Sequence, residues 1–140
     1  MTYYIEDLQP GMSARFTKTV SERDVQQFGE VSGDINPVHF DEAFAKTTPF
    51  KGRIAHGVLT ASYISTVLGM DMPGPGTIFL ALNTRFKAPV RIGDTVTAIC
   101  TVRDIVAEKR RVVFDCVCLV GDTVVIEGDA TVMTPARPRG

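Results

Sequence analysis

Apolar residues alternate with polar ones near the start of the chain and then change to a helical spacing. Even positions between residues 12 and 20 are apolar except for Lys18, and a period of two predicts a strand with one buried face. Ser21 and Asp24 have the spacing of a helix capping box, and apolar residues follow every three or four positions. A short amphipathic helix is therefore predicted over residues 22–30.

A second apolar segment predicts a buried helix. Over residues 55–68 apolar side chains occupy nearly every helical face, and no residue between 53 and 69 is acidic. Two prolines and two glycines break the chain at 70–76, and three or four apolar strands follow. We expect these strands to form an antiparallel meander. Its turns are placed at Gly93-Asp94, at the charged run 108–111 and at Gly121-Asp122.

The order of these elements predicts an α+β fold in which an antiparallel sheet wraps around one central helix. The chain has 140 residues, of which 44% are hydrophobic and 22% charged, as is usual for one globular domain. We therefore expect residues 1–140 to form a single domain.

Charge and cysteine content exclude several classes of function. Fifteen Lys and Arg residues against sixteen Asp and Glu residues give a net charge of -1, which provides no field for holding nucleic acid or an anionic membrane. The N-terminal residues lack the plan of a signal peptide, and no apolar run is long enough to span a bilayer, so we expect a cytoplasmic protein. Three cysteines and two histidines show no zinc-ligand spacing, so we expect free thiols and no metal.

The densest cluster of polar, chemically capable residues lies in a loop-forming segment between the two predicted helices. Asp34, Asn36 and His39 occur within six residues, so a carboxylate and an imidazole can face one point. Pro37 biases Asn36 away from the α region, and we expect residues 34–39 to be extended or turned and not to form another helical turn. Asp34 and Asn36 could also simply close Asx turns, as these residue types do in ordinary loops.

The segment FGEVSGDINPVH at residues 28–39, followed by Ala45, resembles the hydratase-2 signature of the MaoC-like (R)-specific enoyl-CoA hydratases. The similarity continues through IAHG at residues 54–57 and FKAPV at residues 86–90, and so covers most of the chain. The resemblance implies a hot-dog fold, in which an antiparallel sheet wraps a long central helix and two copies usually form a dimer. It also implies reversible syn addition of water to a trans-2-enoyl-CoA, giving the (3R)-3-hydroxyacyl-CoA without a cofactor.

Residue by residue, the resemblance makes Asp34 and His39 the catalytic pair. Chemistry supports this, because water is a poor nucleophile and needs a positioned base while an acid protonates the α-carbon. Which of the two groups takes the first proton stays open, since strongly coupled groups titrate as a pair. Asn36 is a candidate for direct catalytic work or for a structural role.

Three further candidates lie on the central helix. Gly57, at its expected start, could offer a backbone N–H to the thioester oxygen, aided by the helix dipole. The family's active-site serine matches Ser65, which could orient substrate or merely bond to a helix carbonyl. Leu68, one turn further, is a candidate wall for the acyl chain. His56 is expected to cap or hydrogen-bond.

Several alternatives remain open at this stage. The same residues would serve a 3-hydroxyacyl-[acyl-carrier-protein] dehydratase, and a non-catalytic acyl-CoA-binding subunit could keep the fold. A hot-dog thioesterase is disfavoured because the central helix carries no carboxylate. Acyl length and pathway, whether polyhydroxyalkanoate supply or β-oxidation, are not determined.

An open sheet has an edge strand that needs cover, so we expect a homodimer. Candidate cations for the CoA phosphates are Arg53, Arg85, Lys87, Arg91 and Lys109, with Asn83 beside them.

Overall fold

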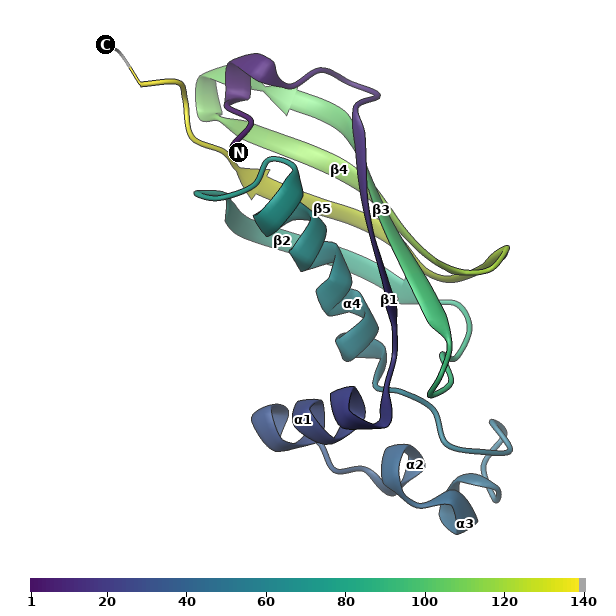
Figure 1. Ribbon diagram of the computed structural model, residues 1–140. Coiled ribbons are helices and arrows are strands. Elements are labelled where there is room, and N and C mark those ends of the chain that lie inside the picture. The colour runs from purple at the N-terminus through teal and green to yellow at the C-terminus, as the bar shows by residue number, and fades with distance from the viewer. Residues whose placement is uncertain (139–140) are drawn as a thin grey trace.

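Five antiparallel strands form one sheet in the order β1-β3-β4-β5-β2, and a central helix lies against its concave face (Figure 1). The structure is a computed structural model and describes residues 1–138. The strands are β1 (Ser13–Thr19), β2 (Ile78–Phe86), β3 (Thr95–Val106), β4 (Arg111–Val120) and β5 (Thr123–Met133). The α-helices are α1 (Glu22–Ser32), α2 (Pro37–Phe40), α3 (Glu42–Ala45) and α4 (Gly57–Thr66), and α4 continues into a π-helical turn at Val67–Asp71. This is the hot-dog architecture that the resemblance implies.

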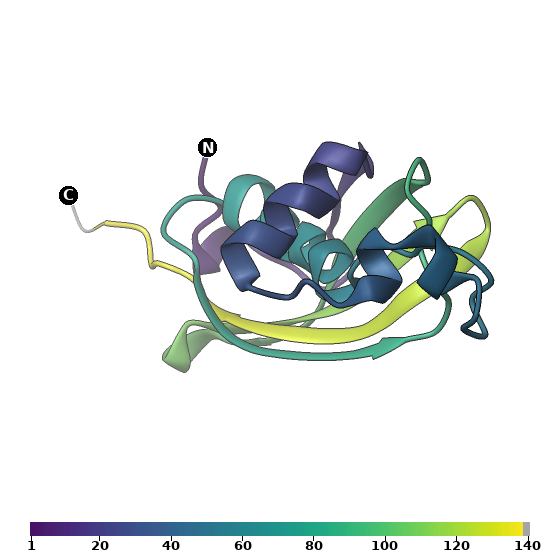
Figure 2. The ribbon, with the colours of Figure 1, turned by 90° about the horizontal axis from the view of Figure 1, so that it is seen from below.

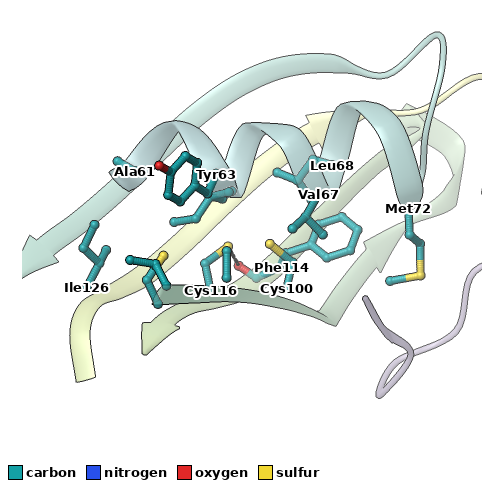
Figure 3. Packing of buried hydrophobic residues seen from close by; sticks show 14 of the residues in the cluster. Ala61, Tyr63, Val67, Leu68, Met72, Cys100, Phe114, Cys116 and Ile126 are labelled. Atoms are coloured by element: carbon teal, nitrogen blue, oxygen red, sulfur yellow. Dashed lines mark hydrogen bonds between the residues drawn. The ribbon is translucent and has the colours of Figure 1, made fainter. Parts of the chain in front are cut away.

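The core forms where α4 meets the sheet. Figure 3 shows Tyr63, Val67 and Leu68 above Phe114 and the cysteine side chains of the central strands. Leu68 is 1% exposed and Phe114 is completely buried, and each such side chain contributes roughly 1.5–3 kcal/mol by leaving water. The three cysteines are free thiols, as predicted, and all are buried in this layer.

The first strand and helix agree with their predictions. Ser21 and Asp24 form the capping box that starts α1, and Gly33 ends the helix in the left-handed conformation, with φ of 79°. Lys18, which interrupts the apolar pattern of β1, forms an ion pair with Asp24 at 3.1 Å. The polar residue in the strand therefore ties β1 to the start of α1.

The expected meander is correct for β3, β4 and β5 and wrong for β2. Gly93 and Asp94 do not turn β2 back onto β3. Their backbone groups instead bond to Val20, so that β3 starts beside the end of β1. β2 crosses to the opposite edge and pairs with β5, which leaves its other edge without a neighbouring strand among residues 1–138.

The three short helical segments α1, α2 and α3 gather around the N-terminal end of α4 (Figures 1 and 2). This end of the central helix therefore carries the polar segment that the sequence singles out. No helix within the described part of the chain is long and apolar enough to cross a membrane.

Candidate active site

Asp34 follows directly on the end of α1 and is held by an Asx turn. Its Oδ1 accepts the backbone N–H of Asn36 at 3.2 Å, and its own N–H donates to the Ser32 hydroxyl at 3.1 Å. Oδ2 takes no part in this turn, and the Asp34 side chain is exposed. The ordinary loop role of this aspartate is therefore present, and it still leaves a carboxylate oxygen available to a substrate.

Asn36 caps a helical turn that the sequence interpretation did not expect. Its Oδ1 accepts the N–H of Val38 at 3.1 Å, and Pro37 occupies the first position of α2. The expectation of a non-helical segment therefore holds up to Asn36 and is wrong from Pro37 to His39. The physical reason is that proline disfavours a helix before it but is well suited to a first helical position, where its missing N–H has no intrahelical partner.

His39 projects from α2 and is buried, with 8% of its surface exposed. Its Nδ1 lies 2.9 Å from the carbonyl oxygen of Ile54. Because a carbonyl only accepts, Nδ1 carries the hydrogen and Nε2 holds a free lone pair in the neutral ring. Burial lowers the pKa of His39 below its ordinary value of 6.5, against the opposing effects of the Ile54 hydrogen bond and the Asp34 charge. The lowered pKa favours the neutral ring, in which Nε2 can accept a proton.

Arg53 fixes the backbone of this histidine. Its Nε donates to the His39 carbonyl at 2.7 Å, and its two terminal nitrogens bind the Glu22 carboxylate at 2.7 and 2.8 Å. Such bidentate pairs hold a specific geometry, so Arg53 joins α1, α2 and the segment before α4. Arg91 likewise binds the carbonyls of Phe50, Gly52 and Arg53. Both arginines, candidates for CoA phosphate contacts, are engaged within the protein.

His56 completes the cluster from the residue before α4. Its Nε2 lies 2.8 Å from the carbonyl oxygen of Asp34, and its ring stacks on that of His39 with centroids 3.9 Å apart and planes at 28°. Its side chain makes no capping bond to α4, so of its two expected roles the hydrogen-bonding one is correct. A ligand atom from each of Asp34, His39 and His56 lies within 4.8 Å of the others.

Those three residue types could hold a metal ion by distance alone, but the ring geometry favours acid–base chemistry. A tetrahedral zinc site needs lone pairs that converge on one point about 2.0–2.1 Å from each nitrogen. Stacked imidazoles direct their lone pairs within two separate planes, and Nδ1 of His56, the nitrogen that is not at a backbone carbonyl, is buried.

A pocket of about 420 Å³ lies between the start of α4 and the end of β2. Asp34, His39 and His56 do not line it, but Ile54, whose carbonyl bonds His39, and Gly57, which follows His56, both do. Gly57 lies on its wall, and a Cβ built there would approach the Phe86 ring to 2.8 Å. As the first residue of α4, Gly57 has an N–H without an intrahelical partner. The pocket is lined by Phe50, Ile54, Ala55, Gly57, Val58, Thr60, Phe86, Lys87, Ala88, Pro89, Val90 and Ile126.

Ser65 and Leu68 lie further along the central helix. Ser65 is exposed, whereas Leu68 is buried in the core layer of Figure 3, and neither lines this pocket. The structure thus brings together Asp34, His39 and the start of α4, and it places the other two candidates beyond the pocket wall.

Two features of the site were not identified in the sequence. The stacking of His56 on His39 joins residues 17 positions apart, and no local spacing signals it. Thr60 lines the pocket with a fully buried hydroxyl that has no hydrogen-bond partner among the described residues. In the sequence it is one position of an apolar helix, and only the pocket distinguishes it.

Comparison with known proteins identifies close relatives of this arrangement. Residues 7–117 match the family model described as a MaoC like domain. The chain is 55% identical to an (R)-specific enoyl-CoA hydratase of Rhodospirillum rubrum over 96% of its own length and 94% of that protein. It is 46% identical to a 3-hydroxybutyryl-CoA dehydratase of Methylorubrum extorquens, over 96% and 85% of the two chains. The unliganded R-hydratase PhaJ1 of Pseudomonas aeruginosa superposes with a TM-score of 0.91 at 39% identity, over 97% and 88%.

Proposed function

The chain belongs to the family of MaoC-like domains, and from that premise we propose that it is an (R)-specific enoyl-CoA hydratase. It adds water reversibly to a trans-2-enoyl-CoA and yields the (3R)-3-hydroxyacyl-CoA, which makes it a hydro-lyase. One observation carries the proposal: a carboxylate oxygen of Asp34 and a ring nitrogen of His39 lie within 4.8 Å of each other near the N-terminal end of the central helix, whose first residue, Gly57, lines an apolar pocket.

Asp34 and His39 act as the acid–base pair. As the water oxygen bonds to the β-carbon, the pair takes a proton from that water and delivers a proton to the α-carbon on the same face. The lone pair on Nε2 of His39 suits this exchange, because the Ile54 carbonyl holds the ring hydrogen on Nδ1. Electrons and protons balance with water alone, so the proposed reaction uses no cofactor.

Gly57 supports the same step through its backbone. Negative charge grows on the thioester oxygen as the α-carbon becomes enolate-like, and an N–H aimed at that oxygen stabilises it. Gly57 is the first residue of α4 and lines the pocket. The dipole of α4 also favours negative charge at this end of the helix. We assign a substrate-supporting role to Asn36, which shapes the turn between the pair. Ser65 as a substrate-orienting hydroxyl and Leu68 as an acyl-chain wall are left out of the proposed site, because neither lines the pocket and Leu68 is buried in the core.

The edge of the sheet formed by β2 supports a homodimer. β2 lacks a strand partner on one side among residues 1–138, and Leu82 and Phe86 are 43% and 54% exposed. Their partners across the ladder, Ala130 and Ile126, are core residues, so both side chains point to the same face as α4. A second copy of the chain would cover this apolar edge. We place the dimer, with its acyl-CoA substrate, in the cytoplasm.

The decisive assay follows the conjugated thioester of crotonyl-CoA by its ultraviolet absorbance, with a thiol reagent in parallel and chiral analysis of the product. Loss of conjugation without thiol release, giving the (3R) alcohol, is the expected result. Thiol release would indicate a thioesterase instead. No turnover of four-, six- or eight-carbon enoyl-CoAs, with turnover of the acyl-carrier-protein thioester, would indicate the dehydratase.

A further inference from the structure

His56 occupies a position that neither the acid–base chemistry nor the pocket explains. It is 2% exposed, and it sits against three aromatic rings: His39 at 3.9 Å, Phe28 at 4.8 Å and Phe40 at 5.6 Å between centroids. A polar ring buried this deeply is expected to make defined hydrogen bonds.

Its single hydrogen bond fixes the ring. The Asp34 carbonyl can only accept, so Nε2 of His56 donates and carries the hydrogen. The other nitrogen, Nδ1, is sealed from solvent and has no partner among the described residues. Because Nδ1 is inaccessible and Nε2 is engaged with the backbone, neither nitrogen can reach a substrate.

The two contacts of His56 meet the two members of the proposed catalytic pair. The donated hydrogen bond ties the backbone of Asp34 to the start of α4, across a sequence separation of 22 residues. The His56 ring also stacks on the His39 ring and supports it from one face. The sequence contains only these two histidines. Asp34 is otherwise held by contacts within its own turn.

We propose that His56 is a positioning residue, which holds Asp34 and His39 in reacting register through its Nε2–H bond to the Asp34 carbonyl and its stack on His39. The inference rests on the proposed hydratase function. It assigns no proton transfer to His56. Misplacement of a reacting group by about 1 Å can cost on the order of 10²-fold in rate, which sets the expected size of the effect.

Two variants separate the donor from the ring. His56→Phe keeps an aromatic ring for stacking and removes the donor, whereas His56→Gln places an amide nitrogen near the position of Nε2 and removes the ring. We expect kcat for crotonyl-CoA hydration to fall about 10²-fold in His56→Phe with KM unchanged, and His56→Gln to recover most of that loss. Phe28→Leu, which removes a ring neighbour and leaves the donor, is the matched control for packing. Circular dichroism and thermal melting establish that each variant is folded.

The outcomes distinguish this inference from the function on which it rests. Wild-type kcat in a folded His56→Phe enzyme would overturn the positioning role while leaving the hydratase intact. A kcat in His56→Gln as low as that in His56→Phe would also overturn it, because it would show that a restored donor to the Asp34 carbonyl does not hold the pair. A wild-type protein inactive on enoyl thioesters would overturn the proposed function and this role together.

Discussion

Backbone carbonyls hold the proposed catalytic residues as much as side chains do. The Ile54 carbonyl fixes the hydrogen of His39, the His39 carbonyl is itself held by Arg53, and the Asp34 carbonyl receives His56. These bonds orient the rings and occupy neither Oδ2 of Asp34 nor Nε2 of His39. The charge and the lone pair that the chemistry needs therefore remain on Asp34 and His39.

Replacing either member of the pair should abolish most of the turnover. Asp34→Asn keeps the Asx-turn acceptor and removes the charge, and His39→Gln keeps a polar side chain and removes the basic nitrogen. Each should lower kcat for crotonyl-CoA by roughly 10²–10⁴-fold, the usual worth of general acid–base catalysis. Glu30→Gln, which removes an exposed carboxylate from α1, should leave kcat unchanged. Near-wild-type turnover in either pair variant would contradict the assignment.

Burial of His39 also predicts a pH dependence of stability. Its pKa in the folded protein lies below the ordinary value of 6.5, because burial disfavours the charged ring. As the pH falls below 6.5, the unfolded chain therefore binds a proton at His39 that the folded protein binds only at lower pH. The stability that results from this difference is fully present above pH 6.5 and is lost as the pH falls through the folded pKa. Urea unfolding at pH 7.5 and at pH 5.5 should show a smaller loss of stability in His39→Gln than in wild type. An equal loss in the two proteins would exclude this linkage.

At the scale of elements, the sequence predicted what is local and missed what is distant. The capping box of α1, the apolar α4 and the hairpin strands β3, β4 and β5 each follow from residues close together in the chain. The crossing of β2 to the far edge does not, because neighbouring strands in sequence usually pair. The pair Asp34 and His39 was accessible through its motif, whereas the contacts of His56 required the fold.

Gly128 of β5 pairs with Thr84 of β2 and has no room for a side chain. A Cβ there would lie 1.9 Å from the carbonyl oxygen of Asn83, which is backbone and cannot turn away. Gly128→Ala should therefore lower the free energy of unfolding by about 1–3 kcal/mol, as overpacking does. Thr131→Ala, on the same strand and opposite Ala81 of β2, is the control and should cost no more than about 1 kcal/mol. Equal urea midpoints for the two variants would show that the strands can separate without cost.

For the whole molecule, the uncovered edge of the sheet determines the assembly that we expect. The concave face continues past α4 onto β2, where Leu82 is 43% exposed although its cross-strand partner Ala130 is buried. Within residues 1–138 no element covers that strip, and a second copy would present a self-complementary strip across a two-fold axis. Light scattering should therefore give about twice the chain mass of 15.2 kDa for the wild-type protein.

A charge placed on that strip should separate the protomers. Leu82→Arg would bury an unpaired guanidinium in the proposed interface, which is strongly unfavourable without a partner. Asn83→Arg adds the same charge one residue away, on the opposite face of β2, and should leave the dimer intact because successive strand residues point to opposite sides. Because the start of α4 and Phe86 of β2 share the pocket wall, dissociation should also lower hydratase activity. A wild-type monomer at micromolar concentration, or a dimer in both arginine variants, would show that β2 is not the interface.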